Sequence, residues 1–476
     1  MQGTKLLIIF ALLGVSRAHA QFTDSLEVKV GTTGTIATKD YQPLWLVSNR
    51  FGIISDRKAD LSTHARISDI HLLNENFYIR YGLDLYNNNQ FKDVFIQEGF
   101  LKAGYKKLEF RAGRFEERIG EVDKDLSSGS WGISGNARPI PKIGFALTDY
   151  ADIPFTNGWL QFKGQISHGW MGEEQYIPGA FLHEKALYVR IGKKQLKLYG
   201  GLQHYALWGG NRPDLPKIKN SFKDFWNVFI GKEGDDGTVN NPEYRPNRPG
   251  DHRGVLEGGI TWENDNMQLH LYNQSMFETG QGITFKNTDR MLGFSYSNKN
   301  KLLKFTAEYL NTKQMNDFFP LNVRESYYNN GIYLTGWEYQ NRIIGTPLFI
   351  NRQRAQHYFD DIKPFDWSKP KDSISGKGWN IVNNRITGLH LGAMYMLGSS
   401  LKARTLLTYT KNHGNYLEPH FEPALTQWYT LQEVSWQTPL EPLTLTGGAA
   451  VDWGDLGNNA GFMLGVQWRF NFPSSH

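Results

Sequence analysis

Near the end of the chain, the segment Gly461–Phe472 alternates between large apolar residues and mostly small or polar ones. The apolar set is Phe462, Leu464, Val466, Trp468, Phe470 and Phe472, and the other set includes Gln467, Arg469 and Asn471. Alternation with a period of two predicts a β-strand with one apolar face, because successive side chains leave a strand on opposite sides. The pattern alone does not say whether the apolar face meets a protein core or lipid.

The same alternation recurs along most of the chain, for example in segments 77–86, 160–170, 303–309 and 401–409. It predicts roughly 18 to 20 strands, many near the ~9–11 residues that a tilted membrane strand needs. The polar faces of these segments carry many charged residues: Arg80, Asp84, Lys163, Glu184, Arg190, Lys197, Lys304, Glu308, Lys402, Arg404 and Arg469. A wide membrane barrel accepts such charges in its lumen, whereas its outer face is apolar and carries aromatic girdles.

These two faces predict an all-β fold, a transmembrane antiparallel β-barrel of about 18 strands that forms a single domain over residues 21–476. In the final strand, the Phe462–Phe472 side then faces lipid, while Gln467 and Arg469 face the lumen. The last strand must pair with the first, because hydrocarbon offers no water to bond an open sheet edge. The alternative is a secreted all-β solenoid or sandwich, although the sequence has no repeat period of the solenoid kind.

Four long polar segments interrupt the alternation, at Glu116–Ile143, Leu207–Gly254, Asn311–Asn330 and Asn341–Arg385. Long loops usually carry function or cover something, and in outer-membrane barrels the long connections lie on the outside. Within the second segment, Lys217–Ile230 has apolar residues at helical spacing and predicts a short amphipathic helix.

Composition and the N-terminal segment indicate an exported protein. Aromatic residues make up 14% of the 476 residues, and cysteine is absent. Residues 1–20 are typical of a signal peptide, because Lys5 precedes a short apolar stretch and Ala18-His19-Ala20 fits the cleavage rule. Loss of Lys5 and Arg17 lowers the formal charge from +5 to +3 (5 − 2), which gives no case for nucleic-acid binding.

No combination of residues predicts catalysis, a metal site or a cofactor. His183 and Glu184 are adjacent in a predicted strand and therefore face opposite ways, and the sequence there is not HExxH. Asp235-Asp236-Gly237 lacks the ligand spacing of a calcium loop, and the adjacent Glu116 and Glu117 are more typical of a solvated rim. The glycine-rich stretch SSGSWGISG has no lysine where a phosphate-binding loop requires one. We therefore predict that the protein is not an enzyme.

Sugar binding is the chemistry that the loops favour. Aromatic rings stack on the C–H faces of pyranose rings, while neighbouring polar side chains bond the hydroxyl groups. The residues that we predict to contact a glycan are Trp208, Asn211, Arg212, Asp214, Trp226 and Arg245. Four arginines suit acidic glycans through bidentate pairing with carboxylates: Arg138, Arg212, Arg245 and Arg248. Alternatively, the rings pack the loops together and the arginines pair with carboxylates of the protein itself.

Three stretches resemble a known family: AGRFEERIGEVDKDLSSGSWGISGNARPIPKIGFALTDYADIPFTNGWLQFKGQISHGWM (112–171), FLHEKALYVRIG (181–192) and LYGGLQHYALWGG (198–210). They resemble the Wzi-type capsule-assembly outer-membrane proteins, in the branch common in Bacteroidetes-type bacteria. The combination of SGNARPIPKI with LHEK is fairly specific to that family. It contains Arg138, Pro139, His183, Glu184 and Lys185, whose chemical role the sequence does not give.

The resemblance implies a barrel of about 18 strands, closed by inward loops and by helical elements toward the periplasm. It implies lectin-like binding that attaches and organises capsular polysaccharide at the cell surface. The expected partners are capsular or surface polysaccharide, outer-membrane lipid and lipopolysaccharide, and the barrel-assembly machinery. The aromatic final strand resembles the signal that this machinery recognises, with Phe470 or Phe472 in that part. The alternatives are a transport porin for oligosaccharides or other solutes and an outer-membrane enzyme of another type.

Overall fold

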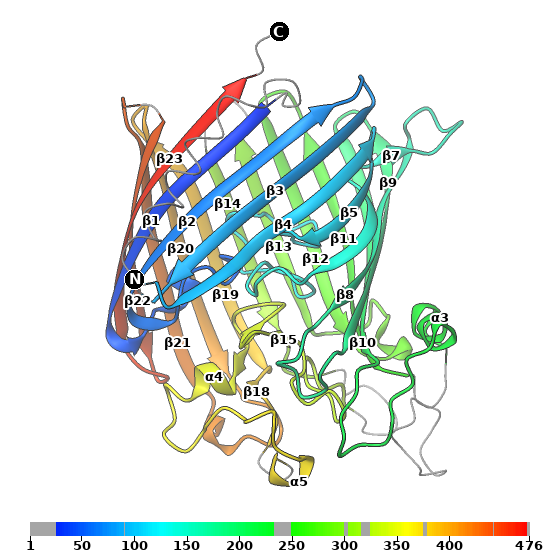
Figure 1. The fold of residues 1–476 in the computed structure, drawn as a ribbon, viewed down its shortest axis with the longest axis vertical. Coiled ribbons are helices and arrows are strands. Elements are labelled where there is room, and N and C mark those ends of the chain that lie inside the picture. Colours follow the sequence, from blue (N-terminus) through cyan, green and yellow to red (C-terminus); the bar gives the residue numbers. More distant parts are fainter. Residues whose placement is uncertain are drawn as a thin grey trace, which may run out of the picture.

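The computed structural model describes residues 25–89, 91–232, 249–298, 303–315, 324–374, 378–440 and 442–473, and most of them form one closed antiparallel barrel (Figure 1). The wall strands are β1 (Ser25–Tyr41), β2 (Arg57–Leu72), β3 (Phe77–Asn88), β4 (Asp93–Tyr105), β5 (Leu108–Arg114), β6 (Lys142–Leu147), β8 (Leu160–Trp170), β9 (Phe181–Lys193), β10 (Leu196–Trp208), β11 (Asp251–Glu263), β12 (Met267–Phe277), β13 (Arg290–Asn298), β14 (Leu303–Asn311), β19 (Ile386–Leu397), β20 (Leu401–Asn412), β21 (Leu425–Gln437), β22 (Leu443–Gly454) and β23 (Asn459–Pro473). The predicted signal peptide, residues 1–20, lies outside the described residues.

Nineteen strands of the described residues share the main sheet. One of them, β7 (Ala151–Asp152), has two residues and pairs only with β8, so the wall consists of eighteen strands (19 − 1). The predicted barrel of about 18 strands is confirmed. The barrel closes where β1 pairs with β23, from Ser25 opposite Pro473 to Ala37 opposite Gly461. The first and last strands therefore leave no open edge, as the prediction required.

The two faces of each wall strand differ as the sequence pattern predicted. In β23, Phe462 is 59% and Leu464 is 74% exposed on the outer surface, while Met463 between them is buried. On the lumen side, Gln467 Nε2 lies 3.4 Å from His64 Nε2, and Arg469 forms an ion pair of 2.5 Å with Glu27 on β1. The predicted orientation of the last strand is confirmed.

Aromatic residues gather on the outer surface near both ends of the wall. One end holds the beginning of β1 and the end of β23, and we call it the turn end because its connections are mostly short; the opposite end is the loop end. Near the turn end, the rings of Phe77 and Tyr105 lie 4.5 Å apart. Near the loop end, Trp428 stacks on Trp453 at 5.8 Å and lies 4.9 Å from Tyr409. Two such belts fit the two interfaces of a bilayer.

The remaining elements all lie in connections at the loop end (Figure 1). They are α2 (Leu44–Val47), α3 (Phe222–Ile230), η2 (Gly280–Gly282), β15 (Glu338–Tyr339), β16 (Arg342–Ile343), β17 (Ile350–Asn351), α4 (Arg352–Ala355), α5 (Lys371–Ile374), β18 (Ile381–Asn383) and η3 (Pro419–Phe421). By the rule that periplasmic turns are short, the loop end is the outer one. The implied helical elements toward the periplasm were wrong for the described residues. No helix in the described ranges has the length and apolar character to cross a membrane.

The predicted helix within 217–230 is confirmed as α3, and its limits follow from its end residues. Ser221 and Asp224 form a capping box, in which the Asp224 carboxylate accepts a 2.8 Å bond from Ser221 N. Gly231 ends the helix with φ at 61°, in the left-handed region where glycine is favoured. The helix lies beside the wall at the end of β10 (Figure 1).

Candidate functional site

Residues 115–141, between β5 and β6, form an inward loop that runs inside the barrel (Figure 1). Glu308 on β14 anchors this loop. Its carboxylate accepts hydrogen bonds from Ser127 Oγ at 2.6 Å, from Ser128 N at 2.8 Å and from Ser128 Oγ. Tyr272 OH on β12 donates a fourth bond to the same carboxylate, at 2.6 Å. All four residues are buried, and bonds to an ionised carboxylate are about twice as strong as neutral ones.

Two further bonds tie the inward loop to other parts of the wall. His390 Nε2 on β19 donates to Leu126 O at 2.6 Å. Trp131 N donates to Gln274 Oε1 on β12 at 3.0 Å. The loop is thus bonded to β12, β14 and β19, and Leu126 and Trp131 lie in the large buried hydrophobic cluster. The lumen is filled by protein at this level, as the family resemblance implied.

The glycines of SSGSWGISG serve this close approach. A Cβ on Gly132 would come within 2.3 Å of Gln203 Oε1 on the wall. Gly129 has φ at +114°, a conformation that L side chains rarely adopt. The stretch therefore folds as a lumen-filling segment.

Lys142, at the start of β6, joins a carboxylate of the inward loop to one on the wall. Its Nζ lies 2.6 Å from Glu117 Oε2 and 2.7 Å from Glu184 Oε2, and Ser167 Oγ donates to Glu184 at 2.6 Å. The Lys142 and Glu184 side chains are almost completely buried. Glu117 is therefore an ion-paired residue of the lumen and is not part of a solvated rim, so that expectation was wrong for it.

His183 and Lys185 lie on the opposite face of β9 from Glu184, as the strand geometry predicted. His183 is buried on the outside of the wall, with its ring 5.7 Å from Phe225 and 5.3 Å from Phe229 of α3. Lys185 Nζ donates to Phe229 O and lies 4.6 Å from the centre of that ring. The LHEK motif thus divides its residues between the lumen network and a helix packed on the wall.

A pocket of about 380 Å³ opens among the loops at the loop end, and we call it the loop-end pocket. It is lined by Leu44, Val47, Ser48, Gly52, Ser55, Asp56, Arg57, Asn88, Asp93, Asn136, Arg138, Glu174, Gln340, Asn341, Arg342, Ile343, Pro347, Phe349, Asn351, Gln353 and Arg354. Most of these side chains are polar, and several are planar amides or guanidinium groups that bond hydroxyl and carboxylate groups well. The lining comes from at least four separate connections, so sequence proximity does not reveal it.

The charged groups of the loop-end pocket differ in how fully the protein uses them. Arg354 Nη1 lies 3.0 Å from Asp56, and Arg342 donates to Val47 O at 3.1 Å and Ile54 O at 2.6 Å. Arg138, by contrast, makes one hydrogen bond to the described residues, from Nε to a carbonyl at 3.4 Å.

The guanidinium of Arg138 lies 3.5 Å from the centre of the Phe95 ring, which orients it. Burial, together with the nearby charges of Arg342 and Arg114, lowers the pKa of Arg138 to about 10, so it remains charged at neutral pH. The next residue, Pro139, lines a small cavity of about 20 Å³ below the pocket. Arg138 is therefore a cation of the pocket with donor capacity to spare.

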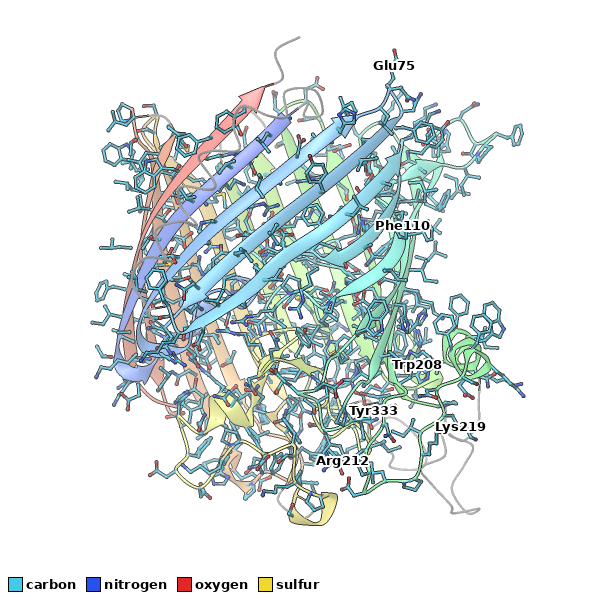
Figure 2. All side chains as sticks on the ribbon, viewed as in Figure 1. Glu75, Phe110, Trp208, Arg212, Lys219 and Tyr333 are labelled. Atoms are coloured by element: carbon cyan, nitrogen blue, oxygen red, sulfur yellow. The ribbon has the colours of Figure 1, made fainter. Side chains whose placement is uncertain are left out.

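An outer pocket of about 620 Å³ adjoins the loop-end pocket, because Glu174 lines both. Arg212, Asp214 and Trp367 line it. The guanidinium of Arg212 is already used: it donates to Tyr176 O and Trp367 O at 2.7 Å each and pairs with Asp214 at 2.7 Å. Figure 2 shows Arg212 among the loops below the barrel wall.

The other predicted glycan residues lie elsewhere. Trp208 is buried at the end of β10, 5.0 Å from Phe181 and 5.7 Å from Phe225, and Figure 2 shows it beside α3. Trp226 is on α3 and is 52% exposed. Asn211 is exposed, and Arg245 lies outside the described residues. The structure does not bring Trp208 and Trp226 together with Arg212 and Asp214, and the contact of all the predicted residues with a glycan stays a prediction.

A family model matches most of the chain. The family model described as capsule assembly protein Wzi matches residues 41–359, about two-thirds of the 476 residues. The chain belongs to the Wzi capsule-assembly family. As a Wzi-family protein and a closed barrel with an apolar outer surface, it is an outer-membrane protein. Among the described residues, no group of three or more His, Cys, Asp or Glu side chains could hold a metal ion.

One solved structure agrees with the Wzi-family fold. Wzi of Escherichia coli, an outer-membrane protein involved in group 1 capsule assembly and a carbohydrate-binding β-barrel, matches 99% of this chain and 88% of its own length. The identity is 14% and the TM-score 0.58. OccK11 (OpdR) and OccK5 (OpdH) of Pseudomonas aeruginosa each match 95% of this chain and 97% and 99% of their own, with identities of 9% and 10% and TM-scores of 0.48 and 0.47. No curated protein sequence matches this chain.

Proposed function

We infer that this protein binds capsular or surface polysaccharide at the outer surface, without catalysis, and organises it there. The observation that carries the inference is that the inward loop fills the lumen while two pockets open among the loops. A barrel filled in this way favours holding a ligand at its outer end over passing solutes through its lumen. Family membership and the carbohydrate binding of the Escherichia coli Wzi support the same function.

The two adjoining pockets suit a polymer better than a single sugar. Pockets that bind small ligands usually measure about 300–1,000 Å³, and two such spaces that share Glu174 give room for consecutive sugar units. Arg138 would bond hydroxyl groups or a uronic carboxylate, with the amides of Asn136 and Asn341 beside it. Of the residues predicted from the sequence, Arg212 and Asp214 would position Trp367 at the outer pocket.

Several further expectations belong to this proposal. A signal peptide of residues 1–20 would direct export, and residues 21–476 would fold as one barrel domain. Outer-membrane lipid and lipopolysaccharide would surround the wall, and the assembly machinery would recognise the final strand. Neither a cofactor nor a nucleic acid has a part in this function.

The test is binding of purified capsular polysaccharide from the producing bacterium to the full-length protein in detergent, measured by titration calorimetry. Arg138→Gln removes the pocket cation and should weaken binding by about 1.5–3 kcal/mol, the typical value of a bond to a charged group. The matched control is Arg80→Gln, which removes an exposed lumen arginine near the turn end. Absence of saturable binding to the unmodified protein, or equal binding by both variants, would contradict the proposal.

A further inference from the structure

The helix α3 packs on the outside of the barrel wall through one of its two apolar ridges. Val228 is buried with Ala206 and Trp208 of β10, and Phe225 packs partly against them. Phe229 lies against His183 and Lys185 of β9. These contacts fix the helix against the outer face of the wall near its loop end (Figure 1).

Beneath α3, the outer face of the wall carries a group of polar side chains. The group lies on three adjacent strands and consists of His168, His183, Lys185 and His204. In the strand register, His168 is opposite His183 and Lys185 is opposite His204. Farther along β9, the outward positions are apolar and exposed, with Leu187 at 56%. Because α3 covers these polar side chains, the helix separates them from whatever surrounds the outside of the barrel.

The second apolar ridge of α3 faces away from the barrel. Phe222, Trp226 and Ile230 follow one another at a spacing of four residues and therefore lie on one side of the helix. They are 82%, 52% and 52% exposed. Trp226 stacks on Phe229 at 4.9 Å, which joins this ridge to the one that packs on the wall. The ridge is thus an apolar surface next to the lipid-facing wall, which begins at Leu187.

The segment around this ridge is cationic. Residues 217–232 carry four lysines and one aspartate, a formal charge of +3 (4 − 1). All four lysines are exposed. Figure 2 shows Lys219 on the side of α3 that is farther from the strands, which is the outer side. An apolar ridge at membrane level with lysines around and beyond it is typical of a helix that lies in the membrane interface.

We propose that α3 lies in the outer leaflet and binds lipopolysaccharide, with Phe222, Trp226 and Ile230 among its acyl chains and the lysines at its phosphate groups. Two features support this occupant: the ridge continues the lipid-facing wall, and its positive charge complements the anionic head groups. The helix then seals the polar patch on the wall from lipid and fixes the depth of the barrel. The inference rests on the proposed lipopolysaccharide leaflet and is independent of glycan binding in the pockets.

Because the chain has no cysteine, single nitroxide labels test the ridge directly. The label is placed at Phe222→Cys, or at Ser373→Cys on α5 as an exposed control in the loops. The full-length protein is reconstituted in bilayers that contain lipopolysaccharide. The label at position 222 should collide more with oxygen, which concentrates in lipid, than with a water-soluble nickel complex, and the label at 373 should show the reverse. Water-like accessibility at 222 overturns the proposal, as does spin–spin coupling between labels of two copies, which would mean that a second chain covers the ridge.

A second experiment tests the charges. Lys217→Gln with Lys223→Gln should lower the affinity of the detergent-solubilised protein for lipopolysaccharide roughly fivefold per lysine, measured by native mass spectrometry. The control pair is Lys363→Gln with Lys369→Gln, two exposed lysines of the 312–385 connection. Equal losses in the two pairs overturn the proposal. Polysaccharide binding by the first pair should be unchanged, so a failure here is distinguishable from a failure of the pocket.

Discussion

Removal of the Glu308 carboxylate should loosen the inward loop without breaking the wall. Glu308→Ala deletes the acceptor of the bonds from Ser127, Ser128 and Tyr272. Each buried donor left unpaired costs about 1–3 kcal/mol. The three hydroxyl groups involved can turn toward water or another acceptor, but the Ser128 amide cannot. The unpaired amide costs about 1–3 kcal/mol and the displaced hydroxyl bonds add to it, so we expect the loop to lose about 3 kcal/mol of stabilisation.

The loop keeps its bonds to His390 and Gln274, so it should open transiently rather than leave the lumen. A loss of about 3 kcal/mol makes local opening roughly 100-fold more frequent. Hydrogen exchange of the amides in residues 123–133 should accelerate by that factor. Single-channel recordings in planar bilayers should show brief openings in Glu308→Ala and a closed wild-type protein.

The control variant is Arg80→Gln, which changes an exposed lumen charge on β3 near the turn end. It should leave both exchange and conductance unchanged. Wild-type exchange rates in Glu308→Ala would show that the four bonds do not anchor the loop. A stable open pore in the wild-type protein would refute the filled lumen itself and favour the porin alternative.

Three further predictions concern the wall and the loops. Val466→Arg places a charge in lipid at a cost of about 2–4 kcal/mol and should block membrane assembly. Gln467→Arg points into the lumen, and this variant should assemble. Heat-modifiable migration on gels measures assembly, and equal outcomes for the two variants contradict the lipid-facing assignment. Lys142→Met leaves the buried Glu184 carboxylate without a charged partner, while Glu117 keeps its pair with Arg111. It should lower the free energy of unfolding by about 3–5 kcal/mol in a urea titration, and a loss below ~1 kcal/mol would contradict the network. Burial raises the pKa of Glu338 from 4.5 to about 7, so the folded protein favours the neutral form of this carboxyl. The stability of residues 324–374 should therefore fall by about 3 kcal/mol as the pH rises from about 4.5 to 7. Hydrogen exchange at pH 5 and pH 8 checks this, and Glu338→Gln should abolish the difference.

The wall was predictable because its signal is local. Alternation with a period of two is present within each strand, so the fold, the lipid face of β23 and the lumen position of Arg469 follow from short segments. The amphipathic helix α3 and its limits were predictable for the same reason, since Ser221 and Gly231 are neighbours of the helix in sequence.

The residues that fill the barrel were harder to predict from the sequence. Glu308 and Ser128 are 180 residues apart, and no local pattern links a carboxylate on one strand to a serine in a glycine-rich loop. The pocket around Arg138 likewise assembles from connections that are distant in sequence. Trp208 shows a different difficulty: a tryptophan beside polar loop residues is typical both of a sugar site and of packing, and only the position of α3 shows that this ring is covered.

The same ambiguity applies to LHEK. A histidine and a lysine on the outer face of a membrane strand contradict the apolar rule until α3 is seen to cover them. The sequence did indicate a second apolar face on this helix, because the helix has more apolar positions than one packing face needs. Of its second ridge, the sequence interpretation gave a role only to Trp226, as a glycan contact, and left Phe222 and Ile230 without one.

A capsule-retention assay measures whether this protein holds polysaccharide at the cell surface. The gene is deleted and replaced by the wild-type, Arg138→Gln or Arg80→Gln form, and cell-bound and released polysaccharide are measured separately at matched protein levels. We expect that deletion and Arg138→Gln shift polysaccharide from the cell surface to the medium, while wild type and Arg80→Gln retain it. Unchanged retention after deletion would contradict the proposed role in holding the capsule.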